Sequence, residues 1–367
     1  MDDFNRYRLA LARERSGLTK RELARLVDCS EKSLVEWEKG TTVPTSENAV
    51  ALAKALSRPV HFFYLPDPED LPLEAVSFRS LSKLRAGDRS RALAGARMAL
   101  ELNDFLTENF ELPQPDVPDL RHHQNKPEAA ALSLRSRWSL GDKPIKNMVS
   151  LLEFKGIRVF SLAEDCRELN AFSFWHDGTP FVFLNTQKSS ECSRFDAAHE
   201  LAHLVLHQHG EPGGRKAELE ANAFAGAFLM PVSSFATYAP RVPSIPRLIE
   251  AKKDWNVSLA ALAHRMHEVG ILSEWNYRSL CIEIQKAGYR VAEPDSAPRE
   301  MSQVFPKVFR ALHAEGIGKR ELAAQLGWTV DELNALVFGL VLGSIPGGGQ
   351  ETLPFSSDGR ERLRLVK

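Results

Sequence analysis

The sequence has few cysteines and no long apolar run, and both absences narrow what the protein can be. Its 367 residues contain four cysteines, Cys29, Cys166, Cys192 and Cys281, which lie far apart and form no CxxC pair. This spacing argues against a disulfide framework and against a zinc knuckle made of thiolates. No uncharged apolar run approaches the length that a bilayer requires, so we expect no membrane contact.

The sequence also lacks an excess of charge of either sign. Its formal net charge is -1, so any contact with nucleic acid must come from a local basic surface. The first residues, MDDFNRYRLALARERSG, carry charges throughout and lack the apolar core of a secretory signal, which predicts a cytoplasmic protein. The length suits two or three domains.

Changes of pattern along the chain predict an α+β protein in five segments. A helical segment comes first, and a proline-rich linker with one long helix follows it. The third segment mixes helices with three strand-like runs, IRVFSL, AFSFW and PFVFLN, and the turn from His176 to Thr179 makes the last two a hairpin. A helical segment and a flexible, glycine-rich tail complete the chain. The predicted boundaries are 1–66, 67–125, 126–295, 296–342 and 343–367.

The segment HELAH, residues 199 to 203, is the strongest chemical motif. On a helix, His199 and His203 project from one face about a turn apart, as two imidazoles that bind one ion require. Glu200 lies beside them, where metallopeptidases have the glutamate that takes a proton from a zinc-bound water. The motif therefore predicts a zinc site.

A third ligand is expected from the next helix, which carries Glu218 and Glu220. These two glutamates point about 200° apart around a helix, so only one of them can face the metal. His207 lies one turn beyond His203, about 6 Å farther along the axis, which favours a supporting role over direct binding.

HELAHLVLH followed by ELEANAFAGAFLMP resembles the ImmA/IrrE zinc-peptidase family. The resemblance implies that residues 126–295 form a zincin-like α+β domain. It implies that His199, His203 and Glu218 bind Zn²⁺ and that Glu200 is the general base. Asn222, four residues after Glu218, would orient a ligand histidine through its other ring nitrogen, and His207 would lie in the same outer layer.

The N-terminal helices resemble the Xre/Cro/C1-type helix-turn-helix family. Thr19 and Glu22 form a capping-box pattern before the second helix, and Ser30 can cap the third. Residues 6–57 carry RERSGLT, the pair Leu23-Ala24 and a closing WEKG. The resemblance implies that residues 1–66 bind double-stranded DNA, with the third helix in the major groove. A helical dimerisation module is the alternative.

The predicted DNA contacts follow from the position of each residue on these helices. Base contacts are expected from the third helix and phosphate contacts mainly from the start of the second. Arg13 and Glu38 match a structural salt bridge of the family and are left out of this set. The expected base contacts are Glu31, Lys32 and Glu36, and the expected phosphate contacts are Thr19, Lys20, Arg21 and Lys39.

The C-terminal helical segment contains an internal copy of the first. GLTKRELARLVDCS, residues 17–30, aligns without gaps to GIGKRELAAQLGWT, residues 316–329. The register then places Asp331 on Lys32 and Glu332 on Ser33. Because phosphate would repel an acidic third helix, we expect this copy to serve packing or dimerisation.

Two functions remain open at this point. In the first, the chain is a transcription regulator and a zinc metalloendopeptidase of the HExxH type that cleaves a regulatory protein. In the second, it is a non-catalytic repressor or antitoxin-like regulator whose peptidase fold senses a metal or a ligand. Both bind DNA, and for both we expect a homodimer. The residues alone do not decide between them.

Overall fold

The computed structural model describes residues 3–71, 84–162, 169–207, 214–240, 243–337 and 339–341. The chain folds into two compact units. The first takes its described residues from Met1–Leu71, Arg85–Gln114 and Met301–Lys367, and the second from Pro72–Leu84 and Pro115–Glu300. None of the helices in the described part of the chain combines the length and the apolar character that crossing a membrane requires.

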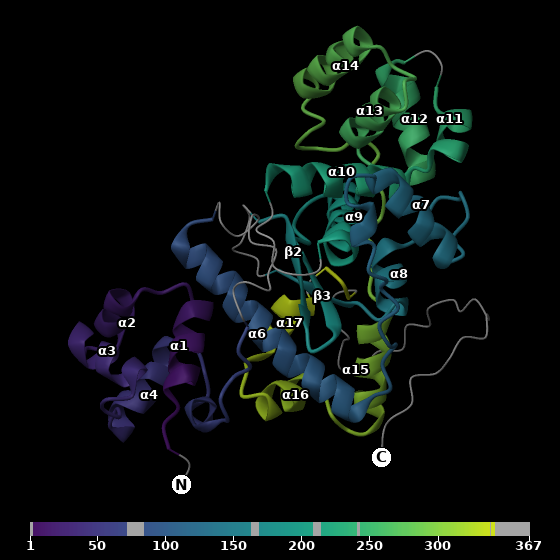
Figure 1. Ribbon diagram of the computed structural model, residues 1–367. Coiled ribbons are helices and arrows are strands. Elements are labelled where there is room, and N and C mark those ends of the chain that lie inside the picture. The colour runs from purple at the N-terminus through teal and green to yellow at the C-terminus, as the bar shows by residue number, and fades with distance from the viewer. Residues whose placement is uncertain are drawn as a thin grey trace. The chain divides into compact units, whose positions relative to one another are not determined.

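The first unit begins with four short helices, which are labelled in Figure 1. Polar side chains cap each of them, and these caps satisfy the amide groups that a helix start leaves unpaired. The capping box predicted at Thr19 and Glu22 is present, and Ser30 caps the third helix as predicted. Gly40 ends that helix in the left-handed conformation. The four helices are α1 (Arg6–Arg15), α2 (Lys20–Leu26), α3 (Glu31–Lys39) and α4 (Ser46–Ala55).

Among the described residues, five further elements belong to the first unit. The 3-10 helix η1 (Val60–Tyr64) follows α4, and the long helix α6 (Ala86–Asn109) contacts α1. The chain returns to this unit after residue 300. The returning helices are α15 (Val304–Ala314), α16 (Lys319–Gln325) and α17 (Val330–Val337).

The second unit contains a three-stranded sheet in the order β1-β3-β2. Its strands are β1 (Arg158–Ser161), β2 (Ala171–His176) and β3 (Thr179–Leu184). The predicted hairpin is confirmed, because β2 and β3 pair antiparallel up to His176 and Thr179. Asp177 and Gly178 both have positive φ, 45° and 75°, as a type I′ turn requires. Strand β1 joins β3 in parallel.

Helices surround this sheet, and they include the two that carry the metal motif. Helix α9 contacts β2 and β3 on one side and α10 on another (Figure 1). The helical elements of this unit are η3 (Arg121–His123), α7 (Pro127–Arg137), α8 (Met148–Phe154), α9 (Ser190–Leu206), α10 (Arg215–Leu229), α11 (Val232–Tyr238), α12 (Ile245–Trp255), α13 (Leu259–Glu268) and α14 (Glu274–Lys286).

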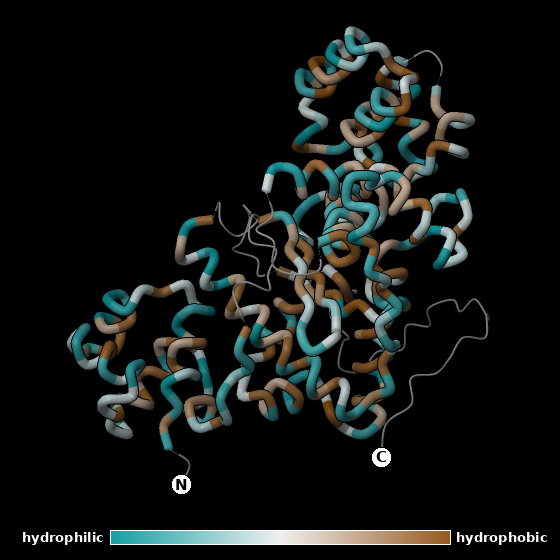
Figure 2. The backbone as a smooth tube through the Cα atoms, in the orientation of Figure 1, coloured by the Kyte–Doolittle hydropathy of each residue, from teal (hydrophilic) through white to brown (hydrophobic). Residues whose placement is uncertain are grey.

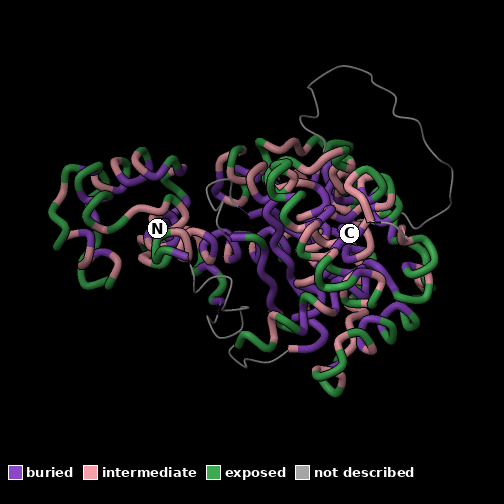
Figure 3. The backbone as a smooth tube through the Cα atoms, turned by 90° about the horizontal axis from the view of Figure 1, so that it is seen from above, coloured by how far each residue is buried: buried purple, intermediate pink, exposed green. Residues whose placement is uncertain are grey.

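The cores follow from the hydrophobic pattern of the elements. Figure 2 shows hydrophobic and hydrophilic residues alternating along the helices, and Figure 3 shows which of these segments are buried. In the sheet, the rings of Phe172 and Phe183 stack at 4.6 Å between centroids, and those of Phe174 and Phe181 stack at 5.2 Å. Stacked aromatic pairs of this kind bury a large apolar area and fix the strands against each other.

Two buried arginines hold the C-terminal end of α10. Arg135 of α7 donates to the carbonyl of Phe228, and Arg265 of α13 donates to the carbonyl of Met230. These carbonyls lie at a helix end, where no backbone amide reaches them, so the guanidinium groups stabilise the end just before Pro231. This arrangement fixes α10, the helix that carries Glu218.

The five-part division predicted from the sequence remains a prediction, and its tail, residues 343–367, lies outside the described residues. Within the described part, the structure groups the C-terminal helices with the N-terminal ones in one unit. The expected α+β class is confirmed, with a small sheet in the second unit and helices in both.

Candidate metal centre and nucleic-acid interface

Helices α9 and α10 bring three potential metal ligands together. His199 and His203 lie four residues apart on α9, and Glu218 lies in the first turn of α10. The ligand atoms of the three side chains all lie within 4.8 Å of one another. The two Nε2 atoms are 3.1 Å apart. The carboxylate oxygens of Glu218 lie 3.9 Å from Nε2 of His199 and 3.7 Å from Nε2 of His203.

The other ring nitrogen of each histidine has a partner. Nδ1 of His199 lies 3.0 Å from Oδ1 of Asn222, and Nδ1 of His203 lies 3.1 Å from Nδ1 of His207. An amide oxygen can only accept, so Nδ1 of His199 donates to Asn222 and its Nε2 keeps a free lone pair. This pairing orients the ring toward the centre of the cluster.

Glu220 contacts His207 and is not one of the three clustered ligands. Nε2 of His207 donates to Oε2 of Glu220 at 3.0 Å, and Lys216 forms a 3.7 Å ion pair with the same carboxylate. Because Nε2 of His207 carries the proton, its Nδ1 accepts from Nδ1 of His203. A continuous chain therefore runs from His203 through His207 to Glu220. The sequence offered Glu220 as an alternative ligand, but the structure gives it this supporting contact.

The environment favours the neutral form of both histidines. Burial lowers the pKa of His199, although Glu218 and Asn222 oppose the shift. Burial also lowers the pKa of His203 well below its usual value, and the neighbouring imidazoles add to this effect. A neutral imidazole with a free Nε2 is the form that binds a metal ion.

Glu200 is buried between α9 and the sheet, with only 1% of its surface exposed. The hydroxyl of Ser173, in β2, donates to Oε2 of Glu200 at 2.7 Å. Burial raises the pKa of Glu200 to about 8, and the carboxylates of Asp196 and Glu218 add to the increase. One feature of the sequence pointed to this contact, because Ser173 is a polar residue within the apolar run AFSFW.

The predicted DNA-contacting residues lie on α2 and α3 of the first unit. Lys32 has 85% of its side chain exposed, and its Nζ lies 3.8 Å from Oε1 of Glu36, one turn later. Thr19 is engaged in the capping box, where its hydroxyl donates to Glu22 at 2.7 Å. The remaining members of the predicted set, apart from the half-buried Lys20, are exposed on the surface: Arg21, Glu31 and Lys39.

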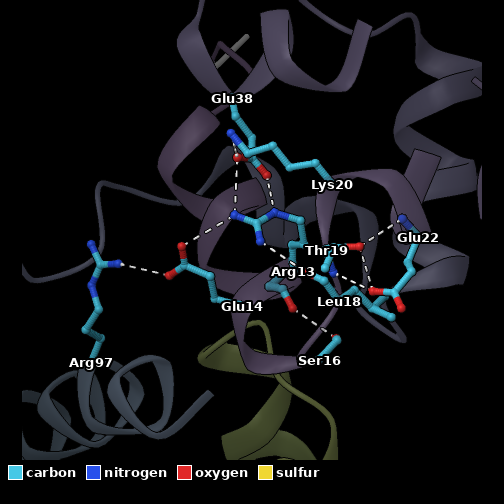
Figure 4. A network of polar contacts seen from close by, with 10 residues as sticks. Arg13, Glu14, Ser16, Leu18, Thr19, Lys20, Glu22, Glu38 and Arg97 are labelled. Carbon is cyan, nitrogen blue, oxygen red and sulfur yellow. Dashed lines mark hydrogen bonds and ion pairs between the residues drawn. The ribbon is translucent and has the colours of Figure 1, made fainter. Parts of the chain in front are cut away.

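A network of charges fixes α2 and α3 against α1 and α6 (Figure 4). Arg13 binds Glu38 at 2.5 Å, which confirms the structural salt bridge expected for this pair. Lys20 also reaches Glu38, at 2.9 Å. On the other side of the network, Glu14 lies 3.4 Å from Arg13 and 4.0 Å from Arg97 of α6. The start of α2 and the end of α3 are thereby held together.

Comparison with known families identifies two regions of the chain. A model of the Helix-turn-helix family matches residues 9–63, which begin within α1 and include α2 to α4. A model of the IrrE N-terminal-like domain family matches residues 153–267, which include the sheet, α9 and α10. A search of curated proteins found no match. The chain therefore contains a region that matches an Xre-type helix-turn-helix domain and a later region that matches a peptidase domain of the ImmA/IrrE type.

Proposed function

We propose that this protein is a transcription regulator that binds double-stranded DNA through α3 and cleaves a regulatory protein at a zinc centre. The zinc ligands are His199, His203 and Glu218, and the general base is Glu200. The convergence of the three ligand atoms within 4.8 Å is the observation that carries this proposal.

The donor set fits zinc. Two imidazole nitrogens and one carboxylate are a common set of protein ligands for catalytic zinc, and they leave a fourth position open. Two nitrogens bound to one zinc in tetrahedral geometry lie about 3.3 Å apart, and the Nε2 atoms here are 3.1 Å apart. Oε1 of Glu218 is buried and has no hydrogen-bond partner among the described residues, which a metal ion would supply.

Zinc bound there would polarise a substrate carbonyl and lower the pKa of a bound water to about 7. Glu200 is next to His199 on α9, and the positive charge of a bound zinc would favour its ionised form. Its carboxylate could then accept a proton from that water. Ser173 holds this carboxylate in one orientation through its 2.7 Å hydrogen bond. Asn222 and His207 hold the two ligand rings, so that the centre is ordered before substrate arrives.

DNA binding relies on the exposed end of α3. Lys32 is free to reach a guanine in the major groove, and Glu31 and Glu36 can accept from cytosine. Thr19, Lys20, Arg21 and Lys39 then lie where phosphate contacts position such a helix. The charge network around Arg13 and Glu38 supports this role, because it fixes α3 on α2.

A non-catalytic regulator is the second candidate, and the burial of Glu200 favours it. A carboxylate that is 1% exposed and bonded to Ser173 can serve as a structural group. In that case the metal centre would act as a sensor, and DNA binding would be the only output.

Substitution of Glu200 by glutamine separates the two candidates. We expect Glu200→Gln to keep fold, zinc and DNA binding, because the amide has the same shape and can still contact Ser173. Cleavage of a co-expressed candidate repressor should fall about 10²- to 10⁴-fold, the usual cost of losing a general base. The measurements are zinc content by elemental analysis and repressor cleavage by electrophoresis.

The sensor candidate predicts a different result in cells. A strain that carries Glu200→Gln would then regulate its target genes as the parent does. Such an intact response, with zinc still bound, would contradict the peptidase proposal.

A further inference from the structure

The C-terminal copy of the helix-turn-helix repeats the N-terminal copy in detail. Helices α2 and α16 begin at Lys20 and Lys319, and α3 and α17 begin at Glu31 and Val330, so both pairs share one offset. Three positions with positive φ recur at that same offset, where turns require the left-handed conformation. They are Gly17 and Gly316, Asp28 and Gly327, and Gly40 and Gly339.

The two copies differ at the end of the helix that would contact bases. In α17 this end carries Asp331 and Glu332. Glu332 forms an ion pair with Arg58, whose side chain is only 1% exposed. A partner of this kind is what a buried guanidinium requires, because an unpaired buried charge is costly.

Arg58 is held at this position from several sides. It lies three residues after the end of α4, and its guanidinium lies 4.7 Å from the centre of the Phe62 ring. It also contacts the sulfur of Met98, in α6, at 3.6 Å. Burial lowers the pKa of Arg58 to about 10, and the charge of Glu332 opposes that decrease. Glu332 thus stabilises a cation that belongs to the N-terminal domain.

The turn before α17 is shaped for the same contact. At Gly327, an added Cβ would lie 2.7 Å from Cδ1 of Leu65 and 3.3 Å from Cδ2 of Phe62. Nε2 of His61 lies 3.3 Å from the carbonyl oxygen of Ala324. In the N-terminal copy, the equivalent position is the exposed Asp28. A Cβ at position 327 would therefore require the side chains of Leu65 and Phe62 to shift, and glycine avoids this.

We propose that the C-terminal copy is a built-in protein ligand of the N-terminal domain and not a second DNA reader. The start of α17, which corresponds to the base-contacting end of α3, binds Arg58 through Glu332. The turn at Gly327 packs on η1. Each chain then presents one reading helix, α3. A DNA site with two half-sites would accordingly require two chains, because one helix of this kind occupies one half-site.

Two glycine substitutions in the full-length chain test the contact. Asparagine tolerates positive φ better than most residues, so both Gly327→Asn and Gly316→Asn preserve the turns. An added Cβ at Gly316 meets no atom within 4 Å, which makes that variant the matched control. We expect amide exchange in residues 58–65 to become at least about tenfold faster in Gly327→Asn only. Equal exchange in the two variants would overturn the proposal.

A second pair of variants preserves the test if Gly327→Asn does not fold. Glu332→Gln removes the charge that binds Arg58, and Asp331→Asn removes a neighbouring, exposed charge. Exchange in residues 58–65 should become faster in the first variant only. The same rate in both would contradict the role of Glu332.

An experiment with DNA tests whether α3 or α17 contacts the bases. A mixed-sequence duplex of about three helical turns is added at low salt, where phosphate contacts are strongest. We expect the amides of residues 31–39 to gain protection from exchange and those of residues 330–337 to stay unchanged. Protection of α17 would show that the C-terminal copy contacts DNA and would refute the proposal.

Discussion

In the metal cluster, each ligand histidine is held by a second side chain, whereas the residues predicted to contact DNA lie on an open surface. Nδ1 of His199 has Asn222 as its partner, and Nδ1 of His203 has His207. Lys32, by contrast, is 85% exposed, and its 3.8 Å contact with Glu36 lies within its own helix. Exposed pairs of this kind contribute little, about 0.3 to 0.5 kcal/mol.

The difference shows where single substitutions should have large effects. A buried cluster depends on all of its members, because the loss of one leaves the others unpaired in a medium that cannot solvate them. A surface that binds DNA adds up many similar contacts, and each of them can be lost with a moderate effect.

The largest effect is expected in the metal cluster at Glu218. We predict that Glu218→Ala loses zinc on dialysis, because two imidazoles alone remain as ligands. Glu220→Ala should retain one zinc per chain, since Glu220 contacts His207 and not the ligand centre. Elemental analysis of the two purified variants checks this. Zinc lost from Glu220→Ala and kept in Glu218→Ala would reverse the assignment of the third ligand.

A smaller effect is expected one layer outward, at Asn222. Without its amide oxygen, the ring of His199 is no longer oriented, so Asn222→Ala should weaken zinc binding about 10- to 100-fold. Asn222→Asp keeps an acceptor at the same place and should restore most of the affinity. Competition with a zinc chelator measures both. Equal affinities of Asn222→Ala and the parent would mean that Asn222 does not orient the ligand.

The smallest effects are expected on the DNA surface, where two lysines should differ in kind. Lys32→Ala should reduce discrimination between operator and non-operator duplexes by about 1 to 3 kcal/mol. Lys20→Ala should weaken all sequences alike and lower the salt dependence by about one charge. Lys54→Ala, which removes an exposed charge from α4, is the control. Binding titrations at several salt concentrations provide both quantities.

One outcome would assign base recognition to the C-terminal copy of the helix-turn-helix. If Asp331→Ala changed the sequence preference as much as Lys32→Ala does, α17 would have to contact bases. The DNA-binding surface would then lie on α17 and not on α3. That surface would not be an open one, because Glu332, next to Asp331, pairs with the buried Arg58.

Several helices, the hairpin and the two ligand histidines could be predicted from local sequence patterns, because each depends on residues only a few positions apart. The spacing of His199 and His203 follows from the helical repeat alone, and the capping box at Thr19 needs only its own helix. The hairpin between β2 and β3 follows from Asp177-Gly178, since these two residues accept the positive φ of a type I′ turn. The internal copy is visible in the sequence, because residues 17–30 and 316–329 align without gaps and share the segment KRELA.

Tertiary structure alone decided which distant residues meet. Ser173 reaches Glu200 only because β2 packs on α9, and Glu220 finds His207 only because α10 lies against the same helix. The pairing of Arg58 with Glu332 joins residues from opposite ends of the chain. Contacts of this kind depend on how whole elements pack, and packing is set by shape and burial over many residues, which no local pattern contains.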